Sequence, residues 1–396
     1  MNGEILDCGV VGIHGFAQRH LRSLLALQAA GRVRLVGAVA HERARDEPWA
    51  RELEGAGVRL LPDLDALLEL GVAVVTLPIG ITLHAPLALR CLAAGRHVYL
   101  EKPVAATLAD VDALAAAERR SGRVLLVGFQ DLFQDGVRAL KRRLAAGEFG
   151  AVRRIVTTTG WPRPPSYYTR NAWAGRLAVA GAPVLDSVAN NACAHFLNLA
   201  LFFAGASAEG TARPRAVSAQ LWRGHAITSF DTCAIRVATA DGPEILFAAS
   251  HLGATAMPPA LRIECTGGTI LNDDLEGEQP WRISAAGRSE EVAVTARHQG
   301  ALANALRCFA GEDVPVCRLA HARAHTAVVV AAHASCPIAT FPAERLVAGQ
   351  DRLVHPLIDR CLATAHARGI DLVAAGLGPA PRGACAVTLE DGPGAA

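Results

Sequence analysis

Lysine is almost absent from this chain of 396 residues. Lys102 and Lys141 are the only two, and the other 37 basic residues are arginines. A guanidinium stays protonated near neutral pH and cannot act as a base, whereas an amine can. We therefore ask of each lysine what only an amine can do at its position.

An excess of either charge is also lacking. The 39 basic and 37 acidic residues give a net charge of +2, so nothing favours nucleic acid or an anionic membrane as a partner. Three stretches without charged residues, 71–89, 187–208 and 324–343, have the length of a membrane helix. Because they contain proline, asparagine or histidine, we interpret them as buried segments. No basic region precedes the first apolar run, so we expect no signal peptide.

Cysteine pairs are missing as well. None of the ten cysteines forms a CxxC pair, and none combines with histidines at zinc-finger spacing. Scattered cysteines on apolar segments are typical of reduced, buried thiols. We therefore expect a cytoplasmic protein without a bound metal.

The order of apolar runs predicts two domains, and the length agrees. Up to residue 127, short apolar runs alternate with helical patterns, which is typical of βαβ units and a parallel sheet. From 128 to 374 the strand patterns are longer and alternate, which predicts an α+β domain with a mostly antiparallel sheet. Residues 375–396 are rich in Gly, Pro and Ala and are expected to form a flexible tail. The overall fold class is therefore α/β.

A glycine-rich turn follows the first predicted strand, 6–11, and precedes the helix predicted over 17–30. In dinucleotide-binding Rossmann folds, this turn and the helix N-terminus receive a pyrophosphate. The residues expected at the cofactor are Gly12, His14, Gly15, Phe16 and Ala17. His14 stands where a second glycine lets the backbone approach the phosphate, so it either covers the pyrophosphate or blocks it.

The second predicted strand, 33–40, ends at His41, with Arg43 close behind. An acidic residue at this place would select the 2′-hydroxyl of NAD. His41 and Arg43 favour a 2′-phosphate and hence NADP, or are solvated loop residues. The cofactor prediction is therefore NAD or NADP.

Glu101-Lys102-Pro103 follows the strand predicted over 96–100. Ligands of open parallel sheets bind at the carboxyl ends of the strands. A lysine held there beside an apolar wall can lose its proton and carry one for a substrate. The alternative is a surface lysine paired with Glu101. The scarcity of lysine favours the catalytic interpretation.

The run from His84-Ala85-Pro86 to Glu101-Lys102-Pro103 resembles the Gfo/Idh/MocA oxidoreductases, and the resemblance extends through 147–150 and 266–270. It implies a Rossmann domain, a C-terminal domain whose open sheet forms a dimer or tetramer interface, and NAD(P)-dependent hydride transfer on a sugar, cyclitol or similar polyol. It also implies that Lys102 contacts the substrate hydroxyl and that Glu101 lies near the nicotinamide ribose. We also expect Pro78, His84 and Gln130 in the cofactor site.

The segment from Asp186 to His195 enters an apolar helical run that ends at Gly205. The family has an Asp and, four residues on, a His, which in one register places Asn190 at the histidine position. A second register uses His195 and keeps an imidazole at the site. We favour it, with His195 relaying the proton with Lys102 and Asp186 orienting it. The alternative is a core histidine with asparagine caps.

Aromatic and hydrogen-bonding residues crowd the segment 161–175. Such a mixture suits a polyhydroxylated or phosphorylated ligand, or an oligomer interface. Asn191 is four residues from His195, which suggests a shared helix face. The residues expected at the substrate are Arg163, Tyr167, Tyr168, Arg170, Asn171, Trp173, Asn190 and Asn191.

Three functions remain open from the sequence. The first is an NAD(P)-dependent oxidoreductase acting on a secondary alcohol of a small polyol. The second is an epimerase, lyase or glycosidase that uses the cofactor without net redox. The third is an idle binding protein, which the histidine in the glycine turn suggests. Lys141 is expected to be an ordinary surface residue, and His225 and His251 are given no functional role.

Overall fold

The computed structural model describes residues 5–42, 47–277, 279–293, 300–349 and 351–389. The chain forms two compact units, one from 1–133 and 298–322 and the other from 134–297 and 323–396. The first unit is thus assembled from two separate segments of the chain. The sequence had assigned the second of these segments to the C-terminal domain.

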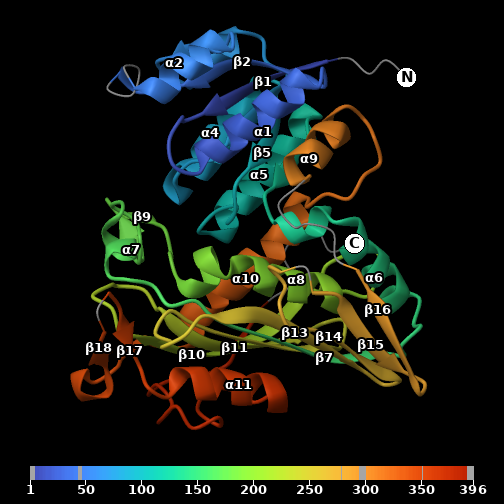
Figure 1. Ribbon diagram of the computed structural model, residues 1–396, viewed down its shortest axis with the longest axis vertical. Helices are drawn as coiled ribbons and strands as arrows, with labels where there is room; N and C mark the ends of the chain where they lie inside the picture. Colours follow the sequence, from blue (N-terminus) through green and yellow to red (C-terminus); the bar gives the residue numbers. More distant parts are fainter. Residues whose placement is uncertain (1–4, 43–46, 278, 294–299, 350, 390–396) are drawn as a thin grey trace. The chain divides into compact units, whose positions relative to one another are not determined.

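The first unit contains a six-stranded parallel sheet in the order β3-β2-β1-β4-β5-β6 (Figure 1). Its strands are β1 (Leu6–Val11), β2 (Val33–Val39), β3 (Arg59–Leu61), β4 (Val74–Leu77), β5 (His97–Leu100) and β6 (Leu125–Val127). Its helices are α1 (Ala17–Ala29), α2 (Pro48–Gly55), α3 (Leu64–Glu69), α4 (Ile81–Ala93), α5 (Leu108–Ser121) and α9 (Ala301–Phe309). The order reverses between β1 and β4, and this is where such sheets bind their ligands.

Local sequence explains the helices of this unit. Thr107 caps α5 by accepting a hydrogen bond from the Asp110 amide at 3.1 Å, and Gly122 ends the helix in the left-handed conformation. The apolar strands β1, β4 and β5 are buried almost throughout, as expected for a sheet covered on both faces. The predicted Rossmann fold is confirmed.

Residues after α9 complete one edge of this sheet. The amide of Val127 in β6 donates to the carbonyl of Cys317 at 3.0 Å, and Leu126 forms an antiparallel bridge with Arg318. A segment far along the chain therefore pairs with the edge of β6 that would otherwise be open.

The second unit contains a large, mostly antiparallel sheet in the order β16-β15-β14-β13-β7-β12-β11-β10-β17, with β20 also pairing with β10 (Figure 1). Its strands are β7 (Val152–Gly160), β10 (Pro214–Arg223), β11 (Thr232–Thr239), β12 (Glu244–Ser250), β13 (Met257–Cys265), β14 (Gly268–Asn272), β15 (Trp281–Ala285), β16 (Arg288–Val292), β17 (Ala339–Thr340) and β20 (Val387–Thr388). This confirms the α+β domain expected after the Rossmann domain.

One edge of the large sheet collects several strand ends. β7 and β12 are parallel, with Gly160 opposite Ser250, so both strands end there. The turn from β10 to β11 lies at the same edge, because Thr232 pairs with both Trp222 and Ser250. The residues after β7, β10 and β12 are therefore neighbours in space, although they are far apart in sequence.

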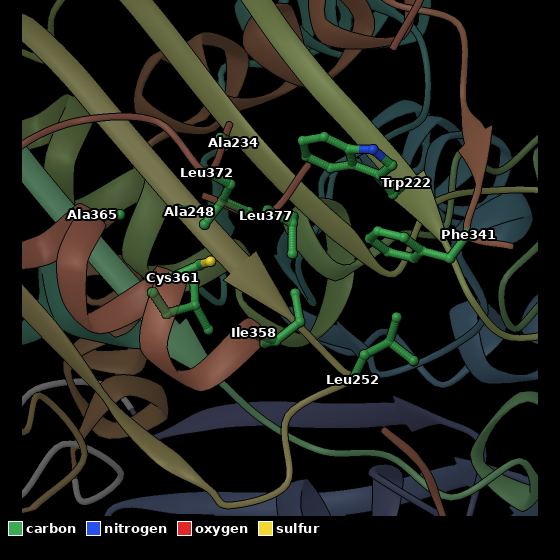
Figure 2. Packing of buried hydrophobic residues seen from close by; sticks show 11 residues of the cluster. Trp222, Ala234, Ala248, Leu252, Phe341, Ile358, Cys361, Ala365, Leu372 and Leu377 are labelled. Carbon is green, nitrogen blue, oxygen red and sulfur yellow. The ribbon is translucent and has the colours of Figure 1, made fainter. Parts of the chain in front are cut away.

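Helices pack on both faces of the large sheet. α8 (Ala194–Ala204) and α11 (Ile358–Arg368) each contact the central strands β7, β12 and β13, from opposite faces (Figure 1). Beneath α11, buried apolar side chains from the helix, the sheet and later loops form one cluster (Figure 2). Within it, the rings of Trp222 and Phe341 stack with centroids 5.9 Å apart. The other helices of this unit are α6 (Asp135–Ala145), α7 (Ser166–Thr169) and α10 (Leu319–Ser335), whose first residues belong to the first unit.

The segment expected as a flexible tail is packed in its described part, 375–389. Val387 and Thr388 pair with Val217 and Ala216 of β10, and Leu377 is buried in the cluster under α11. Backbone pairing compensates for the small apolar bulk that suggested a tail. In the described part of the chain, none of the helices is both long enough and apolar enough to cross a membrane.

The prediction for Lys141 was wrong. The residue lies on α6 and is fully buried, and its Nζ donates to the carbonyl of Gly205 at the end of α8. Nζ also lies 5.3 Å from the ring centroid of Phe202. The helical run around it looked solvated because Arg142 and Arg143 are its sequence neighbours, but the buried face of α6 contains Lys141.

Candidate active site

The turn between β1 and α1 places glycine where the backbone requires it. Gly12 and Gly15 have φ of +100° and +58°, the left-handed region that glycine enters without steric cost. His14 is not among the residues with positive φ, so a side chain there does not strain the turn. The absence of a second glycine at this position is thus compatible with the turn.

The turn leaves hydrogen-bond donors available. As far as the described residues go, the amides of His14, Gly15 and Phe16 have no acceptor, and a Cβ on Gly15 would meet nothing within 4 Å. Free amides at a helix N-terminus are the groups that bind a pyrophosphate. Ala17 is buried and begins α1, so it anchors this arrangement. The turn therefore fits the diphosphate of a dinucleotide.

The side chains around the turn are exposed. The imidazole of His14 lies beside Glu47, with Nδ1 3.6 Å from Oε2, and Phe16 is 42% exposed. His41 is exposed just beyond β2, and Arg43 lies outside the described residues. The direction of His14 toward Glu47 does not favour a histidine that closes the turn.

Glu101-Lys102-Pro103 stands at the carboxyl end of β5, between the ends of β4 and β6. Glu101 is 7% exposed, and its Oε1 lies 2.9 Å from Nε2 of His20 on α1. Its other oxygen accepts from the Lys102 amide at 3.3 Å. A Cβ on Gly128 would lie 2.9 Å from Oε1 of Glu101, so a larger residue at this position would have to displace the carboxylate. Lys102 is half-buried and precedes Pro103 through a cis peptide bond.

His20 was not predicted from the sequence as a residue of the candidate site. It is 5% exposed, and its ring lies 5.6 Å from that of Phe16 and 5.5 Å from that of Tyr99. The signal was present, since His20 shares the buried face of α1 with Ala17, Leu21 and Leu24. A polar residue on such a face needs a polar partner, and Glu101 provides it.

His84 supports the turn that follows Lys102. Its Nδ1 lies 2.7 Å from the carbonyl oxygen of Pro103, and its Nε2 lies 3.0 Å from that of Ile79. The side chain is almost fully buried, and this burial lowers its pKa. Because carbonyls occupy both ring nitrogens, His84 is placed to hold the loop rather than to bind a cofactor through its ring nitrogens.

The two other residues expected at the cofactor also lie at strand ends. Pro78 follows β4 directly and is half-buried. Gln130 is 8% exposed and lies just after β6, and its Oε1 has no hydrogen-bond partner within the described residues. A buried amide oxygen without a donor is costly, so this atom is suited to a bound ligand.

In the second unit, Asp186 organises the chain before α8. Its Oδ2 accepts from the Gly175 amide at 2.6 Å, and its Oδ1 accepts from Asn191 Nδ2 at 2.8 Å. The buried Asn190 side chain donates to the carbonyl of Leu185 at 3.1 Å. These contacts link Asp186 to the aromatic segment as well as to the helix start.

The shared helix face expected for Asn191 and His195 does not exist. Asn191 lies in a π-helical turn, Val188–Ala192, and His195 lies in α8, which begins at Ala194. Cys193 separates them with a non-helical φ and ψ of −105° and 13°. Because the helix is interrupted between the two residues, a spacing of four does not place them on one face.

The aromatic segment after β7 forms a layered cluster. The guanidinium of Arg163 lies 4.9 Å from the ring centroid of Tyr167, and that of Arg170 lies 3.6 Å from it. Arg170 also lies 5.4 Å from the ring of Trp173. Asn171 uses its side-chain oxygen inside the loop, accepting from the amides of Trp173 and Ala174. The predicted arginines and aromatics are thus brought together.

Two histidines without an expected role line the same cluster. The hydroxyl of Tyr168 lies 2.6 Å from Nδ1 of His251, directly after β12. His225, after β10, binds Asp231 through Nδ1 at 2.8 Å and the carbonyl of Arg163 through Nε2 at 3.2 Å. The sequence could not reveal this, because the parallel pairing of β7 with β12 creates the proximity.

Burial fixes the protonation of the Tyr168 and His251 pair. Burial raises the pKa of Tyr168 well above its usual range, and nearby Asp231 adds to this. Burial lowers the pKa of His251 well below its usual range, with a further contribution from Arg163. The phenol therefore donates to Nδ1 of a neutral imidazole, whose proton is on Nε2.

Comparison with known families agrees with this geometry. A family model described as an oxidoreductase family with an NAD-binding Rossmann fold matches residues 6–129, and the model of the GFO/IDH/MocA C-terminal domain matches residues 137–271. Together the two models cover well over half of the chain. The chain belongs to the GFO/IDH/MocA oxidoreductase family.

Curated relatives of this chain have the names of enzymes that act on cyclitols and sugars. Inositol 2-dehydrogenase of Burkholderia lata is 32% identical over 151 residues, which are 37% of this chain and 43% of that protein. The dTDP-3,4-didehydro-2,6-dideoxy-alpha-D-glucose 3-reductase of Streptomyces violaceoruber is 34% identical over 146 residues, 37% of this chain and 42% of that protein. The matched part thus spans less than half the length of these curated relatives.

Solved structures of other dehydrogenases have a similar fold. The WlbA dehydrogenase from Bordetella pertussis, solved with NADH and UDP-GlcNAcA, has a TM-score of 0.68 and 21% sequence identity. The alignment covers 84% of this chain and 96% of that chain. The two chains therefore share their fold over most of their lengths.

Proposed function

We propose that this protein is an NAD(P)-dependent oxidoreductase that transfers a hydride to or from a secondary alcohol of a sugar, cyclitol or sugar-bearing molecule. The observation that carries this is Glu101-Lys102-Pro103 at the carboxyl end of β5, in the same sheet as a glycine turn with free amides. The sugar and cyclitol enzymes among its relatives support the substrate class.

The first unit would hold the cofactor. The amides of His14, Gly15 and Phe16 would bind the diphosphate, and the buried Glu101 would face the ribose next to the nicotinamide. His41, just beyond β2, would lie near the adenosine ribose, and both NAD and NADP remain candidates. When bound, the nicotinamide supplies the hydride acceptor or donor.

Lys102 would handle the proton. We assign its amine to the substrate hydroxyl, where it takes a proton during oxidation and returns it during reduction. His195 would relay that proton, and Asp186 would position the segment before α8 through Gly175 and Asn191. An arginine could not replace Lys102, since its guanidinium does not release a proton near neutral pH.

We further propose a cytoplasmic homo-oligomer, a dimer or tetramer that associates through the large sheet. The ten cysteines are free thiols, and nine of them are buried or half-buried. Free thiols of this kind are expected in a reducing compartment.

The Lys102→Ala variant tests the assignment, with Lys102→Arg as its matched control. Both variants should lose about 10²- to 10⁴-fold in kcat, the range for removing a general acid or base. Both should still bind dinucleotide, measured by the mass and amount released on denaturation. If Lys102→Arg or Lys102→Ala turns over normally with bound cofactor, the assignment is wrong. Turnover without NAD(P)H accumulation would instead favour an epimerase, lyase or glycosidase.

A further inference from the structure

The cluster after β7 has cations without anionic partners. Among the residues that the structure describes, neither Arg163 nor Arg170 forms an ion pair with a carboxylate, and the buried Nε of Arg163 has no hydrogen-bond partner. Most arginines of this unit that approach a carboxylate do so on the sheet or on α6, away from this loop. The two guanidiniums thus lack a counter-charge of their own.

The nearby carboxylates are already occupied. Asp231 is fully buried and accepts from the amide and Nδ1 of His225 at 2.9 and 2.8 Å, and from the Gly224 amide. Asp186 accepts from Gly175 and Asn191. Each carboxylate accepts from a backbone amide and from a side chain, and within the described residues neither forms an ion pair with Arg163 or Arg170.

A third donor points to a ligand as well. His251 is 1% exposed, and its Nε2 has no partner within the described part of the chain. Since Tyr168 donates to Nδ1 of a neutral ring, Nε2 carries the proton. A buried donor without an acceptor is unfavourable and is usually satisfied by water or a ligand.

The stacking of the guanidiniums orients them for recognition. Arg163 lies over the rings of Trp161 and Tyr167, at 5.5 and 4.9 Å from their centroids. The guanidinium carbon of Arg170 lies 3.6 Å from the ring centroid of Tyr167. A guanidinium stacked on a ring keeps its N–H groups at its rim, where they can bind the two oxygens of a carboxylate or phosphate.

We propose that Arg163, Arg170 and His251 form a subsite for an anionic oxygen group, a carboxylate or a phosphate, carried by the sugar substrate. This inference rests on the proposed function and narrows its substrate class from polyols in general to acidic sugars. Tyr167 and Trp173 would contact the apolar face of the sugar beside that group. The subsite lies wholly in the second unit, at the sheet edge where β7 and β12 end.

Calorimetry on the full chain tests the subsite without requiring turnover. The probes are D-glucose, D-glucuronate and D-glucose 6-phosphate, which differ in the anionic group. At least one acidic sugar should bind about 10- to 100-fold more tightly than glucose, the range for charge-assisted hydrogen bonds. A response to glucuronate identifies a carboxylate, and a response to glucose 6-phosphate identifies a phosphate.

Four variants complete the experiment. Arg163→Gln and Arg170→Gln should each remove most of the preference for the acidic sugar, and Arg163→Lys should restore it in part because it keeps the charge without the fork. Arg153→Gln, an exposed arginine at the opposite end of β7, is the matched control and should keep the preference. Thermal melting of each variant identifies any that fails to fold, and Arg170→Gln, at an exposed side chain, then serves in place of Arg163→Gln.

Equal binding of glucose and both acidic sugars would overturn the subsite, as would an equal loss in Arg153→Gln. The proposed function fails separately, if no NAD(P)-dependent turnover of any alcohol is found. Acidic sugars that bind through Arg163 without turnover would support the subsite and contradict the oxidoreductase. NAD(P)-dependent turnover of neutral polyols, without tighter binding of acidic sugars, would support the oxidoreductase and contradict the subsite.

Discussion

Lys141 lies wholly inside the second unit, with its ammonium beside the carbonyl of Gly205 and the ring of Phe202. Burial lowers its pKa to about 8, while Asp241 and Glu209 raise it and Arg138 lowers it. An amine with a pKa of 10.5 in the unfolded chain then binds its proton less tightly when folded. The protonated form is therefore the one that destabilises the fold.

This predicts a stability that depends on alkaline pH. Between pH 8 and 10.5 the unfolded chain keeps the proton that the folded chain has lost, so the free energy of unfolding rises with pH. Relative to Lys141→Met, the native chain should gain up to about 3 kcal/mol over this window. Urea denaturation at several pH values measures it. The buried cysteines, which act in the opposite direction, are common to both proteins, so parallel profiles would contradict the prediction.

His20 and Glu101 form a buried pair in the first unit, and its loss should lower the free energy of unfolding. His20→Ala leaves the Glu101 carboxylate without its 2.9 Å partner, so the first unit should lose about 1–3 kcal/mol of stability. His20→Gln retains a donor and should recover part of it. Denaturation curves of the three proteins compare these effects. Dinucleotide affinity should fall from the native protein to His20→Gln and then to His20→Ala. Equal stability of the native protein and His20→Ala would contradict a stabilising role for this pair.

At the scale of elements, the cluster beneath α11 is the best place to test packing (Figure 2). Leu362 is fully buried, so Leu362→Ala should lower the free energy of unfolding by about 2–5 kcal/mol. Val347→Ala, at a side chain that is 54% exposed, should change stability by less than about 0.5 kcal/mol. Thermal or urea unfolding measures both. A small effect at Leu362 would show that the cluster collapses around the cavity.

Elements with a strong apolar pattern could be predicted from the sequence. β1 has the predicted bounds, and α1 differs by one residue at its end. The short elements α2, β3 and α3 were not predicted, since three to eight residues give too little periodicity. The break at Cys193 was also missed, because a π-helical turn has the same composition as the helix that follows it.

At the scale of the whole molecule, the site was predictable where it is local in sequence. The glycine turn, Glu101-Lys102-Pro103 and the aromatic segment each occupy one short stretch, and the structure places them at strand ends as expected. For His20 the only signal in the sequence is a polar residue on the buried face of α1, and its partner is Glu101. His225 and His251 were not predictable as members of the candidate site, because only the strand order brings distant segments such as Tyr168 and His251 together.

The covering of β6 by residues near Cys317 has a consequence for synthesis on the ribosome. The parallel sheet is complete in sequence by Val127, but the segment that pairs with its last strand emerges almost two hundred residues later. During that time the nascent first unit presents an open strand edge, which is the kind of surface that pairs with other chains. Strands β7 to β16 of the large sheet are translated within this interval, so the N-terminal unit stays open while most of the second sheet is made, although its own first strand is made first.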